Sequence, residues 1–439
     1  MCKIKFSKYF RLILLICLII ISGGCSFGAT VDSMLSPPSL NGEQEQIYHT
    51  LQNAVGKNIL LQYPKTGDYL SSFIVYDIDG DKHDEAIVFY RKKGVSAAEN
   101  DLRVNLLDQM DGKWMSVCDI PAEGAEIERV MISTLGEEGG TKIIVGYSVV
   151  DRSERAIVIY DYKNNQLEEN FKTSYSLFDI HDIDNDETNE LVILQSAEAD
   201  ENAQMLIYKP DSMGNYRRWN VELRSKFTDF SQILYGLLED GTTAIYIDAI
   251  AGATTMQTDI IKFTGDKLEY MIRQEDNSSN TTRSIGSITI DIDKDGIPEI
   301  PVQDVFPGYD SAASDQIKLT RWMAISNNKL IEKYRGYYSQ SDGYAFMLPK
   351  EWIGTVTAVL DQLNGDLVFC RYNGSLSEST TELMRIGIAE GTENCNNKLD
   401  EGYYLLYSRG NAYYFIKTEK STDSIYLNEG ELLHCFMIS

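Results

Sequence analysis

The sequence predicts a mainly β protein in which a strand–turn–strand unit repeats through residues 66–338, followed by a small α+β domain at residues 339–439. Two observations support this fold class. One acidic turn motif occurs three times at nearly even intervals, and short apolar runs flank each copy on both sides. Short apolar runs bounded by turn residues are typical of β-strands.

The repeated motif is Asp-x-Asp-x-Asp-x-x-x-Glu, with copies 105 and 109 residues apart. In a chain with 66 acidic residues among 439, four fixed acidic positions are expected ~0.2 times by chance. The candidate metal ligands are the acids and the position-7 residue, through its backbone carbonyl: Asp77, Asp79, Asp81, His83 and Glu85; Asp182, Asp184, Asp186, Thr188 and Glu190; Asp291, Asp293, Asp295, Ile297 and Glu299.

This spacing predicts Ca²⁺ as the bound cation. Ca²⁺ takes six to eight oxygen ligands, and carboxylates at positions 1, 3, 5 and 9 of a tight loop can converge on one point. Mg²⁺ is an alternative with stricter octahedral geometry. Position 12 holds Val88, Ile193 or Val302 instead of an acid, so the helical EF-hand is excluded. Two other interpretations stay open: solvated turns without metal, and a metal that only braces the turn.

The loops also need residues that tolerate a left-handed backbone. Gly80 and Asn185 at position 4 and Gly296 at position 6 can adopt positive φ. Lys82 and Glu187 stand at position 6, where glycine is usual. We therefore expect weaker cation binding in the first two loops.

Degenerate copies of the unit lie about halfway between the acidic ones. Residues 134–142 and 236–244 keep an acid–Gly pair ahead of apolar runs, but lose the other acids. A strand-rich repeat of ~40–50 residues is the signature of a β-propeller blade. The expected fold is therefore a β-propeller of about five blades, with a β-solenoid as the alternative.

The acidic loops resemble the FG-GAP or VCBS-type repeats of integrin-α-like β-propellers, which bind Ca²⁺ in Asp-x-Asp-x-Asp-Gly-x-x-Asp hairpins. Here Glu replaces the last Asp in all three copies. The resemblance covers about residues 66–338 and implies a propeller with Ca²⁺-binding hairpins. The whole chain also resembles lipoproteins of Gram-positive anaerobic bacteria.

The N-terminus predicts export. Four basic residues precede an apolar run at residues 12–21, which is shorter than the roughly 20 residues that span a bilayer. The following Ser22-Gly23-Gly24-Cys25 resembles the lipobox of bacterial lipoproteins, although Ser22 stands where Leu is typical. The resemblance implies a signal peptide at residues 1–24, a lipid on Cys25 and a location on the outer face of the cell membrane. An ordinary cleaved signal is the alternative.

Charge and cysteine content limit the partners. Removal of residues 1–24 takes the formal net charge from −26 to −30, because that segment holds four basic residues and no acid. Such a surface repels phosphate, so we expect no nucleic-acid partner. Disulfides are allowed outside the cell. The sequence does not choose among the pairings of Cys118, Cys370, Cys395 and Cys435.

The flanking segments complete the domain plan. Residues 25–42 are polar and form a linker, and residues 43–65 contain an amphipathic helix that ends before Gly56. The chain contains no HExxH, GxSxG or P-loop motif. We therefore expect a non-catalytic binding or adhesion scaffold for a protein or glycan of the envelope. The alternative is an extracellular carbohydrate-active hydrolase or lyase, because propellers also carry enzymes.

Overall fold

The computed structural model describes most of the chain after the linker. The expected signal peptide, Cys25 and the linker up to residue 39 lie outside the described residues. Within the described part, no helix is long and apolar enough to cross a bilayer. The described residues are 40–94, 101–137, 139–149, 155–198, 200–238, 240–272, 281–310, 316–418 and 423–438.

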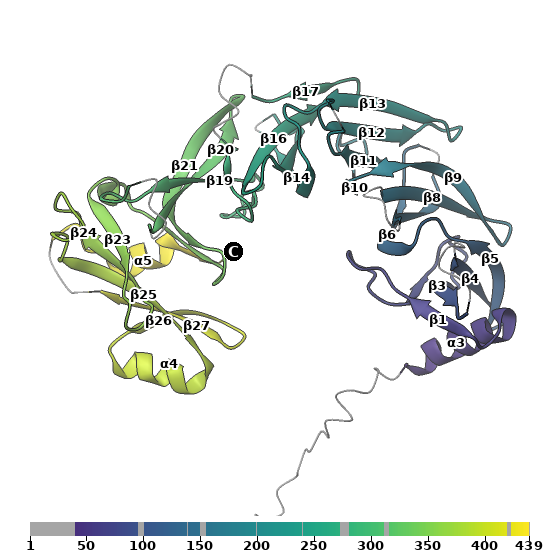
Figure 1. The fold of residues 1–439 in the computed structure, drawn as a ribbon, viewed down its shortest axis with the longest axis horizontal. Coiled ribbons are helices and arrows are strands. Elements are labelled where there is room, and N and C mark those ends of the chain that lie inside the picture. The colour runs from purple at the N-terminus through teal and green to yellow at the C-terminus, as the bar shows by residue number, and fades with distance from the viewer. Residues whose placement is uncertain are drawn as a thin grey trace, which may run out of the picture.

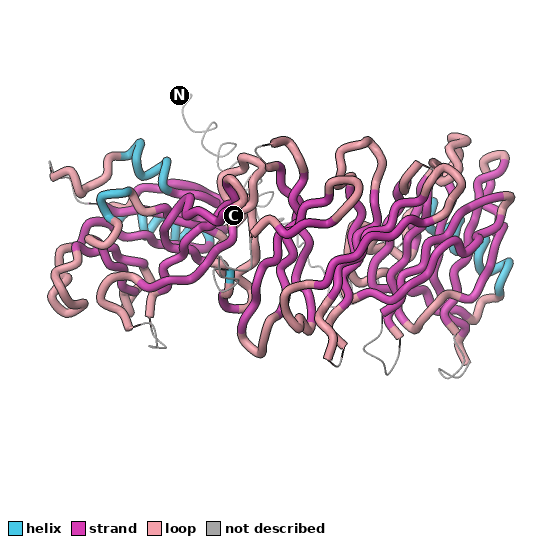
Figure 2. Tube along the Cα trace, turned by 90° about the horizontal axis from the view of Figure 1, so that it is seen from above, coloured by secondary structure: helices cyan, strands magenta, loops and turns pink. Residues whose placement is uncertain are grey.

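Six antiparallel sheets of four or five strands follow one another along the chain in an arc (Figure 1). Loops gather on the two faces of the arc, and helices lie toward its two ends (Figure 2). The mainly β, propeller-type fold is thereby confirmed, with a small helix-containing part at the C-terminus. Among the described residues the arc stays open between its first and sixth sheets, so the blades do not form a closed ring.

The first three sheets contain the first two predicted acidic loops. The first sheet consists of β1 (Ile59–Gln62), β2 (Phe73–Tyr76), β3 (Glu85–Lys92), β4 (Leu102–Met110) and β5 (Lys113–Pro121). The second consists of β6 (Glu126–Thr134), β7 (Thr141–Ser148), β8 (Arg155–Lys163) and β9 (Gln166–Tyr175). The third consists of β10 (Leu177–His181), β11 (Glu190–Gln195), β12 (Gln204–Pro210) and β13 (Tyr216–Glu222).

The last three sheets contain the third acidic loop and the C-terminal region. The fourth consists of β14 (Asp229–Leu237), β15 (Thr243–Ile250), β16 (Thr255–Phe263), β17 (Leu268–Tyr270) and β18 (Arg283–Ser284). The fifth consists of β19 (Ile300–Val305), β20 (Lys318–Ser326), β21 (Lys329–Ser339), β22 (Tyr344–Met347) and β28 (Phe436–Ile438). The sixth consists of β23 (Val356–Leu360), β24 (Leu367–Arg371), β25 (Glu382–Glu390), β26 (Tyr404–Arg409) and β27 (Ala412–Thr418).

Helices lie around these sheets. The N-terminal helix is α3 (Gly42–Val55), and Asn41 and Gln44 form a capping box at its start. Ile47 and Leu51 of α3 pack onto the first sheet. The remaining helices are η3 (Lys350–Trp352), α4 (Gly391–Asp400) and α5 (Glu429–Cys435).

Each of the first five sheets contains one of the five predicted turns. The acidic loops join β2 to β3, β10 to β11, and the isolated bridge residue Ile290 to β19. The degenerate copies join β6 to β7 and β14 to β15. The sixth sheet was not among the five predicted blades. It forms from the C-terminal region, and the residue-338 boundary falls inside β21, whose sheet continues into β22 and β28.

The hydrophobic core lies between successive sheets. One cluster joins the first and second sheets, for example through Phe89 and Val158, and others join each later neighbouring pair. A single blade exposes both of its apolar faces, so stacking is what buries them. The four described cysteines are free and lie in β5, β24, α4 and α5.

A glycine on β14 is required for close packing between two of the sheets. A Cβ at Gly236 would lie 2.2 Å from Pro298 Cδ, in the acidic loop of the next sheet. We expect Gly236→Ala to lower the free energy of unfolding by about 1–3 kcal/mol, because the loop must move away. Denaturant unfolding measures the change. Gly42→Ala is the control, since nothing lies within 4 Å of a Cβ there; equal stability of the two variants would contradict the expectation.

Candidate functional site

The three acidic loops are turns organised by the carboxylate at position 1. The Asp at position 1 accepts two backbone N–H bonds from its own loop, at 2.8 and 3.1 Å for Asp77, 3.1 and 2.9 Å for Asp182, and 3.1 and 2.9 Å for Asp291. Position 6 is left-handed in all three loops, including the two without glycine, Lys82 (φ 75°) and Glu187 (φ 69°). The side chain at position 1 therefore organises a turn that non-glycine residues can also adopt.

The Glu at position 9 is completely buried in every loop. Its Oε2 accepts the backbone N–H of position 2, at 2.7 Å for Glu85, 2.9 Å for Glu190 and 3.0 Å for Glu299. Burial raises the pKa of each of these carboxyl groups to about 7. One oxygen of each Glu thus fixes the loop, and the other is available for a cation.

Three acidic clusters in these loops could bind a metal ion. In each cluster, one ligand atom per residue lies within 4.8 Å of the others. The clusters are Asp77, Asp79 and Glu85; Asp182, Asp184 and Glu190; and Asp291, Asp293 and Asp295.

Three predicted acidic ligands, Asp81, Asp186 and Glu299, and the three position-7 residues are not part of these clusters. The backbone N–H groups of His83, Thr188 and Ile297 donate to the position-5 Asp of their own loop, at 2.8, 3.0 and 2.9 Å. His83 Nδ1 also lies 3.3 Å from Asp81. Position 7 therefore orients the position-5 carboxylate in all three loops.

A lysine from another strand reaches into the second and third loops. Lys209 Nζ of β12 lies 3.2 Å from Asp184, 2.6 Å from Asp186 and 2.7 Å from Glu190. In the third loop, Lys333 Nζ of β21 makes the same three contacts, at 2.8 Å to Asp293, 2.6 Å to Asp295 and 2.8 Å to Glu299. Although burial lowers the pKa of both lysines, the hydrogen bonds that they donate to these carboxylates raise it above its ordinary value.

No such cation reaches the first loop from the described residues. Glu85 Oε1 is buried and has no hydrogen-bond partner there. Across the sheet, Glu85 pairs with Asp108 of β4. Burial, and then the nearby charges of Asp81 and Asp79, raise the pKa of Asp108. The first loop is thus a carboxylate cluster that no lysine of another described strand reaches.

The motif search missed Lys209, Lys333 and Asp108 because they lie outside the loops. In the sequence, these three residues are recognisable only as charged residues in strands. Their relation to a loop acid becomes visible once the pairing of the strands is known. That relation depends on strand register, which the motif does not contain. Leu191 pairs with Tyr208, and this register sets Lys209 beside Glu190.

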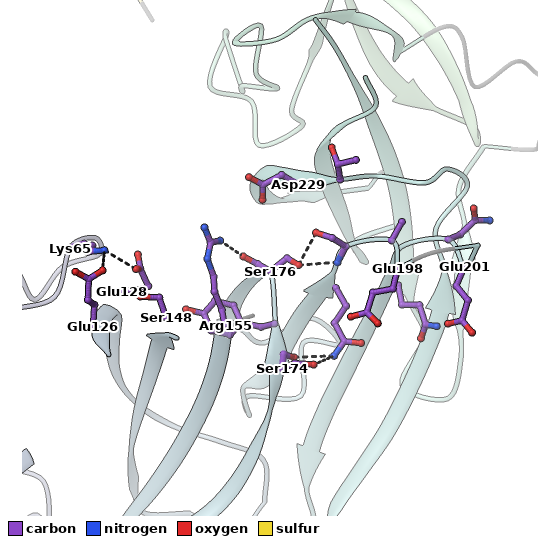
Figure 3. Close-up of a pocket in the computed structure, with 17 residues that line it drawn as sticks. Lys65, Glu126, Glu128, Ser148, Arg155, Ser174, Ser176, Glu198, Glu201 and Asp229 are labelled. Carbon is purple, nitrogen blue, oxygen red and sulfur yellow. Dashed lines mark hydrogen bonds and ion pairs between the residues drawn. The ribbon is translucent and has the colours of Figure 1, made fainter. Parts of the chain in front are cut away.

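A polar cleft of about 780 Å³ lies among the second, third and fourth sheets (Figure 3). Strand ends from the three sheets line it, at Glu126 and Arg155, Gln195 and Gln204, and Asp229. The lining is rich in hydroxyl, amide and carboxylate groups. Such groups form hydrogen bonds in many directions and suit a polar ligand.

The two basic side chains in the cleft are already engaged. Lys65 pairs with Glu126 and with Glu128, the latter at 3.0 Å. Arg155 donates to the Ser176 carbonyl at 2.8 Å (Figure 3). Three further acids also line the cleft, namely Glu198, Glu201 and Asp229. The cleft is therefore acidic overall.

No protein-family model matches this chain, and no curated protein does. Among solved structures, the chain is similar to the Dos1 propeller, with 9% identity, a TM-score of 0.29, and coverage of 81% of this chain and 80% of that one. It is also similar to the exotype rhamnogalacturonan lyase YesX, with 11% identity, a TM-score of 0.28, and coverage of 71% and 64%.

A third similar structure is a rhamnogalacturonan lyase of Bacillus licheniformis, with 9% identity, a TM-score of 0.23, and coverage of 62% of this chain and 60% of that one. This chain thus spans less than two thirds of the length of either lyase. At these TM-scores, none of the three structures indicates what this chain binds.

Proposed function

We propose that this protein is an exported, lipid-anchored β-propeller protein that acts as a non-catalytic binding scaffold for a glycan or protein of the cell envelope. The observation that carries the proposal is the polar cleft among the second, third and fourth sheets. The lipid on Cys25 and Ca²⁺ in the acidic loops belong to the same proposal. The lipid would hold the scaffold at the membrane, and Ca²⁺ would brace its turns.

The chemistry of the cleft favours a neutral or cationic glycan over an anionic one. Both basic side chains are engaged by groups of the protein, while Glu198, Glu201 and Asp229 add negative charge. Serine hydroxyls and the Gln195 amide, which donates to Ser174 at 2.9–3.0 Å, resemble the groups that hydrogen-bond sugar hydroxyls. A ligand with dense negative charge would be repelled.

The test is binding of the Ca²⁺-loaded protein to an array of neutral, amino-containing and acidic envelope glycans, together with retention of envelope proteins. We expect a retained ligand, and we expect Glu201→Gln combined with Asp229→Asn to weaken its binding at least about tenfold, a loss of about 1.4 kcal/mol. Glu393→Gln in α4 is the control outside the cleft.

Two outcomes would contradict the proposal. One is that no envelope glycan or protein is retained by the wild type. The other is turnover of a polysaccharide that the cleft variant abolishes, which would support the carbohydrate-active enzyme instead. A preference for acidic glycans would contradict only the proposal that the cleft repels anionic ligands, and would leave the binding scaffold in place.

A further inference from the structure

We propose that only the first acidic loop binds a divalent cation, with Asp108 as an additional ligand, and that Lys209 and Lys333 serve as built-in countercharges where a metal would lie in the second and third loops. This inference rests on the proposed Ca²⁺ bracing and deepens it, because it says which loop takes the ion. It replaces three equivalent metal sites with one metal site and two lysine-filled ones.

The equivalence of the two lysine contacts is the first argument. Lys209 and Lys333 come from different strands of their sheets, β12 and β21, yet each ammonium contacts loop positions 3, 5 and 9. Those are three of the positions that would coordinate Ca²⁺. An ammonium at 2.6–3.2 Å from these oxygens and a cation at 2.3–2.6 Å from them cannot occupy the loop together.

The first acidic loop also differs from the other two in the surroundings of its buried carboxylate. Its position-9 carboxylate, Glu85, is completely buried, and Oε1 has no hydrogen-bond partner among the described residues. In the other two loops, the same oxygen contacts a lysine at 2.7 or 2.8 Å. Because Glu85 shares a cluster with Asp77 and Asp79 and no described lysine pairs with it, its buried oxygen is the one that a cation would neutralise.

Strand register supplies an independent argument. The residue opposite loop position 9 on the next strand is Asp108 in the first sheet, Asp161 in the second and Lys262 in the fourth. In the second sheet position 9 is Lys142, whose Nζ lies 2.7 Å from Asp161.

In the fourth sheet the opposite residue, Lys262, pairs with the loop acid Asp240 at 2.7 Å. The first sheet differs, because there the opposed pair is Glu85 and Asp108, both acidic. Among these opposed pairs of the described chain, only the first sheet therefore needs an external cation. A divalent ion in this loop would be within reach of more carboxylates than the motif alone provides.

The second and third acidic loops lie between sheets of the arc, which explains why a lysine countercharge stabilises them. The second loop contacts the preceding sheet through the Gly136 N–H bond to the Asn189 carbonyl, at 2.9 Å. The third does so through the Leu237 N–H bond to the Gly296 carbonyl, at 3.0 Å. Both loops form joints between sheets, and a lysine orders them whatever the metal concentration. The first loop belongs to the first sheet, at the end of the arc.

The test is the Ca²⁺ stoichiometry of the full chain, purified in detergent, freed of metal with a chelator, and measured by calorimetry and by native mass spectrometry with Ca²⁺ alone. We expect one ion for the wild type. Lys209→Met and Lys333→Met should each bind two, and the double variant three. Lys262→Met is the matched control and should still bind one, because its loop has lost the other acids.

Variants of the first loop keep the test decisive if a lysine variant fails to fold. Glu85→Gln preserves shape and should reduce the wild-type stoichiometry from one to zero, and Asp108→Asn should weaken binding at least about tenfold. Three ions in the wild type would overturn the lysine assignment and leave the calcium-braced scaffold standing. No ion in the wild type would overturn the first-loop site and the bracing, whereas ligand binding by the cleft is measured separately.

Discussion

Asp248→Ala is expected to lower the free energy of unfolding by about 3–5 kcal/mol, because it leaves the Arg283 charge buried without its partner. Both side chains are completely shielded from solvent in the fourth sheet, and Arg283 Nη2 lies 2.7 Å from Asp248 Oδ1. Burial lowers the pKa of Arg283, and the charge of Asp248 opposes that shift. Removing the carboxylate takes away this compensation.

The same carboxylate also orders the approach to the third acidic loop. Asp248 accepts hydrogen bonds from the hydroxyls of Thr258 and Thr289, at 2.5 and 2.7 Å, and from the Thr289 N–H at 2.6 Å. Arg283 also donates to the Thr281 carbonyl at 2.8 Å. The network thus holds β18 and the segment that leads to Asp291 against β15 and β16. Its loss therefore destabilises more of the fourth sheet than the loss of a single ion pair would.

Denaturant unfolding monitored by circular dichroism measures this loss. Glu269→Ala, in the same sheet, is the control, because its ion pair with Lys267 is exposed to solvent, which screens the attraction between the two charges. Asp248→Leu combined with Arg283→Met should be less destabilised than Asp248→Ala, since neither charge is then left alone. If Asp248→Ala costs no more than the surface control, the buried pair is not what stabilises this region.

Calcium is expected to stabilise the wild type by about 2.7 kcal/mol at a free concentration of 100 times Kd, because it binds the folded state and not the unfolded chain. We expect Glu85→Gln to abolish this gain, since Glu85 supplies a buried oxygen that no described lysine contacts. Glu190→Gln should retain the gain, because Lys209 fills that loop. Thermal unfolding with Ca²⁺ and with a chelator gives both increments.

The comparison between the two Glu variants is what makes this experiment specific. Glu85 and Glu190 have the same burial, the same loop position and the same bond to a backbone N–H. The two sites differ in the charge on the neighbouring strand, which is Asp108 beside Glu85 and Lys209 beside Glu190. If both variants lose the stabilisation by Ca²⁺ equally, the two loops bind Ca²⁺ alike, and the lysine does not determine which loop binds the ion.

Local sequence patterns predicted the repeating elements well. The short apolar runs on both sides of the first two acidic motifs are β2, β3, β10 and β11, and the amphipathic segment that ends before Gly56 is α3. They succeed because alternation, capping and turn residues act between near neighbours in the chain. Helix α4 was missed because its sequence is polar, with Cys395 as its one buried residue among those described.

The sequence by itself determined the strand–turn–strand unit, its repetition and the carboxylates that share each acidic turn. Tertiary structure alone decided that a sixth sheet follows, that the arc stays open, and that three sheets meet around a polar cleft. It also decided which acidic loops a lysine contacts in the described part of the chain, since Lys209 and Lys333 reach their loops from other strands. The physical reason is that electrostatic balance depends on which strands lie side by side, and register between distant segments is set by packing.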